Sequence, residues 1–388
     1  LVIAGGVTTF LNPEPMADFI DLFLIGEGEE IVNEFVDGYI KNNDAEKVEL
    51  LSKLTRIEGV YVPSLYSVGY KPDGTIESFV QKGKASRKVK RRWIRDIDSA
   101  PTISRIFTPD TEFSGMNLVE ISRGCGRGCR FCTAGFIYLP PRIRNPKKIL
   151  DEIEPGLKNA EKIGLVSAAV SDYPFINSLC APLIAKGKKV SVSSLRMDST
   201  TDELVDALKE SGHKTMTFAP EAGTERLRNV INKGISEDDI LKSVEMAISR
   251  GILNAKLYFL IGLPTETDED IEGIVKLAKR IKKEVLVLTK EAGRIGTITL
   301  SINPLIPKPW TPFQWSPMED VKSLGNKLKY IKESLKKEGN IEVNHENPKD
   351  SYLQALLSRG DRRVGGIIKA SLETGSWNRG IKESQVDT

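Results

Sequence analysis

The chain has 388 residues, of which 40% are hydrophobic and 28% charged, a composition ordinary for a globular protein. Its net charge of +3 does not require a polyanionic partner, and the absence of any run of about 18 apolar residues predicts no membrane-spanning segment. Residues 1–6 lack an initiator Met and a basic segment, so we interpret them as a buried strand inside a domain rather than as a signal peptide.

The first 80 residues alternate short apolar runs with helical patterns. The expected strands are residues 1–4, 22–25 and 59–62, and the expected helices are 15–19 and 29–40. The second helix follows a Gly-Glu-Gly turn, and its opening residues, Glu29 and Glu30, suit the positive end of a helix dipole. This alternation of strands and helices predicts part of a doubly wound, Rossmann-like α/β region over residues 1–80.

A basic segment follows. Residues 82–95 contain eight Lys or Arg side chains and Trp93, within an expected basic linker over residues 81–115. Nucleic-acid binding is one interpretation of such a segment, and a solvated linker or edge strand between two domains is the other.

From residue 116 to 316 a strand is followed by a helix six times. The expected strands are 117–122, 163–170, 189–195, 214–219, 254–261 and 295–303, and the expected helices are 146–160, 174–186, 201–211, 236–250, 268–283 and 318–338. Apolar strands separated by amphipathic helices predict a parallel sheet covered by helices. Six units are fewer than the eight of a closed barrel, so we expect an α/β fold with a partial (β/α)6 barrel. Residues 317–388 are expected to form a C-terminal helical extension, with helices near 350–358 and 362–373.

Three of the four cysteines lie within eight residues, at Cys125, Cys129 and Cys132, directly after the first barrel strand. Pairing cysteines this close in sequence would be strained and would leave one over, which favours a metal or redox role in a reducing, cytoplasmic setting. The loop is rich in Gly, which lets a backbone wrap closely around an iron–sulfur core, and its Arg residues can offset the cluster's negative charge.

The loop has two other interpretations. A structural zinc site closes with four ligands, and neither His213 nor His345 lies near the loop in sequence; chance clustering is the remaining alternative. Three thiolates on a four-iron cluster leave one iron open as a binding site. The fourth cysteine, Cys180, is expected to be a small buried side chain in a helix.

A Cys-x3-Cys-x2-Cys motif after a first strand, with Phe131 before the last Cys, resembles the radical S-adenosylmethionine superfamily over residues 116–316. The resemblance implies that the three cysteines bind a 4Fe-4S cluster whose open iron is chelated by the methionine part of S-adenosylmethionine. It further implies reductive cleavage to a 5′-deoxyadenosyl radical that removes hydrogen from a substrate, and a reductant of the flavodoxin or ferredoxin type.

Polar residues follow the barrel strands, where functional groups of such folds collect. From the resemblance, Asp172 is a candidate for the methionine amino group and Arg196 for its carboxylate, while Glu221 can accept hydrogen bonds from the ribose and Gly262 can form part of a wall against the adenine. Each has a structural alternative: a helix N-cap for Asp172, pairing with Asp198 or Glu221 for Arg196, an ion pair for Glu221, and an ordinary strand end for Gly262. No catalytic residue is assigned.

Two further features have structural alternatives. Thr267 and Asp270 resemble a helix capping box, which would explain them without a catalytic role. The proline-rich segment 303–315 carries Trp310, Phe313 and Trp315, which could line a substrate pocket or pack the barrel rim.

Four short sequence motifs resemble those of a poorly characterised group of the superfamily that has a cobalamin-binding-like N-terminal region. They lie at residues 122–125, 218–223, 307–315 and 358–363. No His precedes His213, so cobalamin is possible but is not supported by the residues present. We expect an enzyme acting on an unknown substrate; the alternatives are a methyltransferase or methylthiotransferase acting on RNA or protein, and a non-enzymatic iron–sulfur RNA-binding protein. A methylthiotransferase usually needs three more cysteines for a second cluster, and only Cys180 remains.

Overall fold

The computed structural model describes residues 1–108, 110–290, 295–384 and 386. Contacts divide the chain into two compact units. The first contains Leu1–Arg95, Lys308–Trp310 and Leu353–Thr388, and the second contains Asp96–Pro307 and Thr311–Tyr352. Both ends of the chain therefore contribute to the first unit. The sequence predicted a different division, into residues 1–80, 81–115, 116–316 and 317–388. That division rests on composition and pattern and not on contacts, and it stays a prediction.

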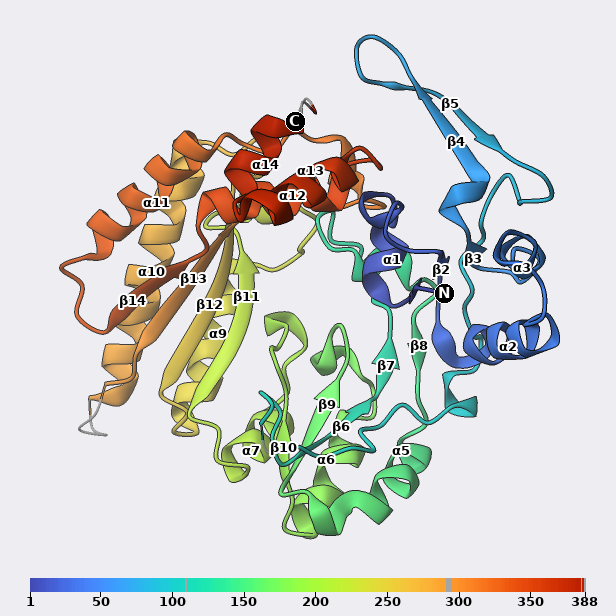
Figure 1. Cartoon of the computed structure of the whole chain (residues 1–388). Helices are drawn as coiled ribbons and strands as arrows, with labels where there is room; N and C mark the ends of the chain where they lie inside the picture. Colours follow the sequence, from blue (N-terminus) through green and yellow to red (C-terminus); the bar gives the residue numbers. More distant parts are fainter. Residues whose placement is uncertain (109, 291–294, 385, 387–388) are drawn as a thin grey trace. The chain divides into compact units, whose positions relative to one another are not determined.

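The second unit contains the parallel sheets of the barrel (Figure 1). One sheet has the order β10 (Lys189–Ser191), β9 (Lys162–Val166), β6 (Met116–Glu120), and the other has the order β11 (Thr215–Glu221), β12 (Asn254–Ile261), β13 (Ile298–Pro304), β14 (Ile341–His345). All of these pairings are parallel. A parallel bridge between Leu195 and Phe218 joins the two sheets beyond the end of β10. No pairing of β6 with β14 is found in the described residues, so the expected partial barrel is confirmed, with β14 as an additional strand.

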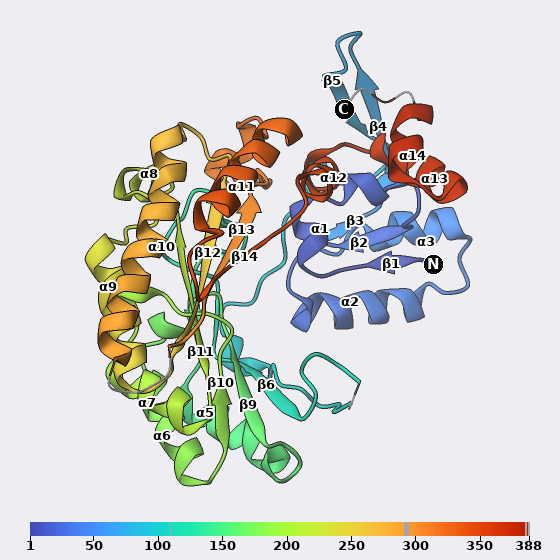
Figure 2. The ribbon, with the colours of Figure 1, turned by 90° about the vertical axis from the view of Figure 1, so that its left-hand side faces the viewer.

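Helices cover the outer face of these sheets (Figure 2). The six expected helices are present as α5 (Pro146–Ile153), α6 (Ile176–Ala185), α7 (Asp202–Glu210), α9 (Glu237–Ser249), α10 (Asp268–Thr289) and α11 (Val321–Leu335). The apolar faces of these helices and the strand residues packed against them form one core, which includes Val119, Ile163 and Leu257. A short helix that was not predicted, α8 (Glu225–Val230), follows β11.

Strands β9 and β10 end earlier than expected, at Val166 and Ser191. The segments that follow them are therefore loops and single 3-10 turns, Val170–Asp172 and Met197–Ser199, at the carboxyl edge of the sheet. At the opposite end of β10, the His213 ring lies 3.1 Å from the carbonyl of Val190, and burial lowers the pKa of His213 below its ordinary value.

The first unit is a small α/β layer. Strand β1 (Ile3–Ala4) pairs parallel with β2 (Leu22–Leu24), which pairs antiparallel with β3 (Val60–Tyr61). Helices α1 (Val7–Leu11), α2 (Gly28–Lys41) and α3 (Lys47–Leu54) accompany the sheet, and the core includes Ile31 and Leu54. The expected helix over residues 15–19 is wrong: only a 3-10 turn, Glu14–Met16, forms. After it the chain turns toward β2, and the N–H groups of Phe19 and Ile20 both donate to the carbonyl of Met16 (3.0 and 3.2 Å).

The C-terminal helices α12 (Pro348–Arg359), α13 (Val364–Thr374) and α14 (Trp377–Glu383) include both helices expected there. Arg362, between α12 and α13, donates to a carboxylate oxygen of Glu14 (2.9 Å), the carbonyl of Tyr66 (3.0 Å) and the hydroxyl of Tyr61 (3.1 Å). These contacts tie the segment to residues near the N-terminus. Within the described part of the chain, no helix combines the length and the apolar character needed to cross a membrane.

Candidate active site

The cysteine loop begins after β6 and the two-residue strand β7 (Ser122–Arg123), which pairs with β8 (Arg142–Ile143). Cys125, Cys129 and Cys132 are all free thiols. Burial raises the pKa of Cys129 and of Cys132, and the neighbouring cysteines add to the effect, so the three sulfurs lie within electrostatic range of one another. The nearby charges of Lys233 and Arg196 act in the opposite direction on Cys129.

Glycine makes the loop possible at one position in particular. Gly124 has φ of +83°, and a Cβ atom there would lie 2.4 Å from the carbonyl oxygen of Tyr138. A side chain at Gly126 would instead meet nothing closer than 3.7 Å. The loop then closes with the backbone N–H groups of Ala134 and Gly135 directed at the Cys132 sulfur, an arrangement that favours the thiolate. The backbone therefore folds back around the Cys132 sulfur.

The turn after α8 holds the cysteine loop against the barrel. The backbone N–H of Arg130 donates to the carbonyl of Ile231 (2.9 Å), and its guanidinium donates to the carbonyl of Val230 (2.5 Å). The side-chain amide of Asn232 donates to the carbonyls of Arg127 (3.2 Å) and Gly128 (2.9 Å). Sequence reasoning missed this turn; its signal was the Asn-Lys-Gly triplet at 232–234, since Asn and Gly both tolerate the left-handed conformation that ends a helix.

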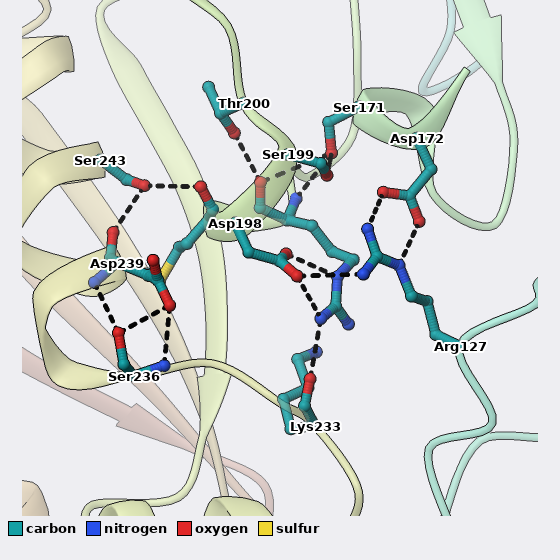
Figure 3. A network of polar contacts seen from close by, with 12 residues as sticks. Arg127, Ser171, Asp172, Asp198, Ser199, Thr200, Lys233, Ser236, Asp239 and Ser243 are labelled. Atoms are coloured by element: carbon teal, nitrogen blue, oxygen red, sulfur yellow. Dashed lines mark hydrogen bonds and ion pairs between the residues drawn. The ribbon is translucent and has the colours of Figure 1, made fainter. Parts of the chain in front are cut away.

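An ionic network links this loop to the ends of β9 and β10 (Figure 3). Arg127 makes a two-pronged contact with the carboxylate of Asp172 (2.9 and 2.6 Å) and also contacts Asp198 (3.1 Å). Arg196 makes a second two-pronged contact with Asp198 (2.8 and 3.0 Å). Asp172 and Arg196, both predicted from the sequence, are thus brought together through Arg127 and Asp198.

The charges within this network lower the pKa of Asp172, the acid that contacts Arg127 of the cysteine loop. Burial by itself would raise the pKa of Asp172, but hydrogen bonds from Arg127 and Ser199 outweigh that effect and the pKa is lowered. Asp172 is therefore held as a carboxylate. The alternative of a helix N-cap is wrong, because Phe175 occupies the N-cap position of α6 and no side chain caps that helix.

Glu221 lies at the end of β11 with φ of +69° and pairs with Lys233, their nearest side-chain atoms being 3.1 Å apart. Only 12% of the Glu221 side chain and 8% of the Lys233 side chain are exposed. Burial raises the pKa of Glu221, and Lys233 opposes that rise. A guanidinium hydrogen bond from Arg196 to the carbonyl of Lys233 (2.7 Å) connects the pair to the ionic network. Lys233 was not predicted, and its ammonium lies 6.0 Å from the centre of the Phe131 ring inside the cysteine motif.

Gly262 follows β12 and is not joined to the ionic network by any contact between described residues. Its φ is +76°, and its N–H donates to the buried carboxylate of Glu266 (3.0 Å), which pairs with Lys327 (2.6 Å). The next residue, Leu263, belongs to the same apolar cluster as Phe131. Gly262 therefore lies one residue from a side chain that packs beside the cysteine motif.

Other predicted features have structural roles. Asp270 accepts a hydrogen bond from the N–H of Thr267 (2.9 Å), which confirms the capping box of α10. Phe313 is buried in the apolar cluster beside the cysteine motif and so packs the barrel rim, whereas 85% of Trp315 is exposed. Trp310 donates to the carbonyl of Phe10 (2.8 Å) in the first unit.

A cavity of about 540 Å³ opens beside the cysteine loop. Cys125 and Arg127 line it from the loop, Asp172 and Ser171 from the turn after β9, and Ser199 from the turn after β10. The volume lies in the range of small-molecule pockets, and the lining combines one thiol with charged and hydroxyl groups. Arg196, Glu221 and Gly262 are outside its wall.

The donor set of the loop fits an iron–sulfur cluster. In the part of the chain that is described, no three His, Cys, Asp or Glu side chains are arranged around one point as ligands of a single metal ion. Thiols that each bind a different iron of a cluster need not converge on one point. The glycine at 124, the cations at 127, 196 and 233 and the N–H groups directed at Cys132 supply space and compensating charge. Cys180 is buried in α6, as predicted, and burial raises its pKa to about 12.

Comparison with family models gives two matches. A model described as "Radical SAM superfamily" matches residues 119–278, and one described as "Radical SAM proteins, N-terminal" matches residues 1–63. The first therefore covers the cysteine loop and the strand ends through β12, and the second covers the α/β layer of the first unit.

Among curated proteins, an uncharacterized protein of Methanocaldococcus jannaschii is 35% identical, over 100% of this chain and 77% of its own length. An uncharacterized methyltransferase of Pyrococcus horikoshii is 26% identical over 76% of this chain, and an anaerobic magnesium-protoporphyrin IX monomethyl ester cyclase of Cereibacter sphaeroides is 25% identical over 72%. The chain spans 61% and 44% of the lengths of these last two proteins.

Among solved structures, the radical S-adenosylmethionine methyltransferase TsrM from Kitasatospora setae, with cobalamin and a 4Fe-4S cluster bound, aligns with a TM-score of 0.52. The alignment covers 80% of this chain and 58% of TsrM at 16% sequence identity. At that identity the likeness concerns the fold alone.

Proposed function

This chain belongs to the radical S-adenosylmethionine superfamily, and on that basis we propose that Cys125, Cys129 and Cys132 hold a 4Fe-4S cluster in an enzyme that acts on an unidentified substrate. Enzymes of the superfamily use this cluster together with S-adenosylmethionine. Once bound, the two supply one-electron cleavage of a carbon–sulfur bond and a 5′-deoxyadenosyl radical able to remove hydrogen from a substrate. The observation that carries the proposal is the set of three free thiols on one loop that Arg127 ties to Asp172 and Asp198, beyond the ends of β9 and β10.

The chain's own residues would hold and charge-balance the cluster. The three thiolates bind iron, and the cations of Arg127, Arg196 and Lys233 reduce the repulsion among them. The hydrogen bonds that Arg130 and Asn232 make between the loop and the turn after α8 fix the positions of the sulfurs. A cluster held in this way is oriented by the barrel rather than by the loop alone.

We propose that the strand ends bind S-adenosylmethionine. Asp172 presents a carboxylate to the cavity beside Cys125, where it can accept hydrogen bonds from an amino group. Among the described residues, Arg196 uses two of its three guanidinium nitrogens on protein partners, which leaves the third for a ligand carboxylate. Glu221 uses one carboxylate oxygen on Lys233, which leaves the other for ribose hydroxyls. Gly262 would let an adenine approach the backbone after β12.

A methyltransferase is the second candidate, because a relative that covers 76% of this chain is described as a methyltransferase. The relatives also include a tRNA-2-methylthio-N(6)-dimethylallyladenosine synthase and a ribosomal protein uS12 methylthiotransferase. The one cysteine left over in this chain, Cys180, is buried in a helix and could not by itself hold a second cluster. We propose no cobalamin ligand, since no His precedes His213. A cluster of this kind needs a one-electron donor in a reducing compartment, and we propose a flavodoxin or ferredoxin in the cytoplasm.

The test compares Cys129→Ala with Cys180→Ala in anaerobically purified protein. Iron, acid-labile sulfide and the visible absorbance of the cluster are measured first, and then the release of 5′-deoxyadenosine from S-adenosylmethionine with a strong reductant. We expect Cys129→Ala to abolish all of them and Cys180→Ala to retain them. A Cys129→Ala protein with a normal cluster and normal cleavage would refute the assignment. A wild-type protein that holds a cluster but cleaves no S-adenosylmethionine would favour a non-enzymatic iron–sulfur protein.

The reaction type needs a second measurement. With methyl-labelled S-adenosylmethionine, transfer of the label to cellular RNA, peptides or metabolites identifies a methyltransferase. Release of 5′-deoxyadenosine without label transfer identifies hydrogen abstraction with another outcome.

A further inference from the structure

The basic segment after residue 81 divides into two parts with different environments. The second part is built into the first unit. The backbone of Arg92 exchanges hydrogen bonds with Ile25 (2.9 Å) and Glu27 (3.0 Å), and the N–H of Ile94 donates to the Glu27 carboxylate (3.0 Å). The Arg92 guanidinium pairs with two acids of α2, and Ile94 is buried. Arg92 and Ile94 are therefore structural.

The first part, residues 82–90, presents its cations to solvent. All of its charged side chains are exposed, and none has a side-chain partner in the described residues: Lys82, Lys84, Arg87, Lys88 and Lys90. Between these cations, Ala85 is buried in an aromatic cluster of the first unit that includes Tyr61 and Tyr66, and Val89 packs against that cluster. The Tyr66 hydroxyl also donates to the carbonyl of Ser86 (2.6 Å). The backbone is thus held in place while the cations point outward.

A hairpin that the sequence did not predict precedes these residues. Strand β4 (Tyr66–Tyr70) pairs with β5 (Ile76–Gln81), and β5 is exposed along its whole length. Figure 1 shows the hairpin extending away from β3 of the same unit. On it, 45% of Phe79 is exposed, and its ring stacks on Tyr66 with a centroid distance of 5.1 Å. An aromatic side chain therefore stands beside the exposed cations.

The charge of the protein is concentrated here. Residues 66–90 contain six Lys or Arg and two Asp or Glu, a net charge of +4, whereas the whole chain carries +3. All other residues together therefore carry −1. We call the five exposed cations and Phe79 the basic hairpin surface.

We propose that the basic hairpin surface binds single-stranded RNA. Its cations are mostly lysines without interleaved acids, and lysine is depleted at protein–protein interfaces but is a common partner of phosphate. A fixed row of cations complements the regular negative charge of a nucleic-acid backbone, and an exposed aromatic ring offers a platform for unpaired bases, which RNA presents in its loops and ends. The binding does not depend on S-adenosylmethionine cleavage.

The experiment measures the fluorescence anisotropy of a labelled mixed-sequence 20-nucleotide RNA with the full, cluster-loaded chain over a range of salt concentrations. The variant K82Q/K84Q/R87Q/K88Q removes four of the cations. Its matched control, K322Q/K336Q/K337Q/K349Q, removes the same charge from exposed lysines outside the surface. We expect the first variant to weaken binding by about tenfold or more and to reduce the salt slope, log K against log salt, by about 3 units, at about 0.7 per lost phosphate contact. The control should change both quantities little.

Each outcome decides the proposal. Equal affinity of wild type and the first variant, or equal loss in both variants, would overturn it, as would capture of an acidic flavodoxin but not of RNA through the same residues. A Phe79→Ala protein should lose affinity with an unchanged salt slope, because stacking involves no charge. Iron content and 5′-deoxyadenosine release are measured on the same preparations and should be unchanged, so failure of RNA binding and failure of the enzyme assignment give different results.

Discussion

Replacing Lys233 by Met would leave the Glu221 carboxylate in the protein interior without its partner. The two side chains are 3.1 Å apart and almost fully buried. Removing one member of a buried ion pair typically costs about 3–5 kcal/mol, because the remaining charge is neither solvated nor paired. The variant should therefore be much less stable than the loss of a surface ion pair would suggest.

The free energy of unfolding lost in Lys233→Met has an upper limit that depends on pH, because Glu221 can take up a proton. Its ordinary pKa is 4.5, and burial raises that value in the folded protein. Protonation costs about 1.4 kcal/mol for each pH unit above the unfolded-state pKa, or about 4 kcal/mol at about pH 7.5. A group with a raised pKa destabilises the fold only as pH rises above its unfolded-state value. The loss in Lys233→Met should thus be small near pH 4.5 and grow toward neutral pH.

Thermal unfolding followed by circular dichroism at about pH 5 and pH 7.5 measures the effect. At about 2–4 °C per kcal/mol, a cost of about 3–4 kcal/mol in Lys233→Met should lower Tm by about 6–16 °C at the higher pH. Adding Glu221→Gln should restore most of the loss, since a neutral amide replaces the unpaired charge. Lys329→Met, which removes an exposed pair with a 3.9 Å separation, is the control and should cost less than about 1 kcal/mol. An equal loss at both pH values, or no recovery in the double variant, would refute the reasoning.

Three further variants test other parts of the structure. Gly124→Ala should lower the iron content per chain severalfold, since its Cβ would overlap a backbone oxygen, while Gly126→Ala should load normally; equal loading of the two would contradict the close approach. Arg362→Met should lower stability by about 2–4 kcal/mol in chemical denaturation, because three hydrogen bonds from a partly buried charge are lost, whereas Arg379→Met at an exposed site should be neutral. His213 has a lowered pKa, so wild-type stability should fall as pH drops below about 6.5; His213→Gln should flatten that dependence, and an unchanged profile would exclude the imidazole as its source.

The sequence predicted most of the barrel because its elements have strong local patterns. Strand β12 occupies residues 254–261 as expected, since its last five residues form a continuous apolar run that ends at a Gly-Leu-Pro turn. Strand β14 was missed because only Ile341 and Val343 mark its inner face, and its remaining residues are polar. The hairpin of β4 and β5 was missed because β5 is exposed on both faces and has no buried side to set a pattern.

The candidate site likewise contains features that the sequence predicted and features that it left open. Three cysteines within eight residues belong to one loop, so the sequence alone determined that they lie together and that they suit an iron–sulfur cluster. It also placed Asp172, Arg196 and Glu221 at strand ends. The choice of partners was open, because Arg196 had two candidate acids, Asp198 and Glu221, and Glu221 had no named partner other than Arg196. The structure settled it: Arg196 pairs locally with Asp198, two residues along the same turn, and the turn after α8 brings Lys233 to Glu221.

Only the tertiary structure could decide contacts between residues that are distant in sequence. The Asn232 side chain reaches the carbonyls of a loop more than 100 residues earlier, and Arg362 binds Glu14 across 348 residues. Local pattern reports which face of an element is apolar, and hence whether it is a helix or a strand. It carries no information about which polar groups meet once those faces are buried, because that depends on how the elements pack.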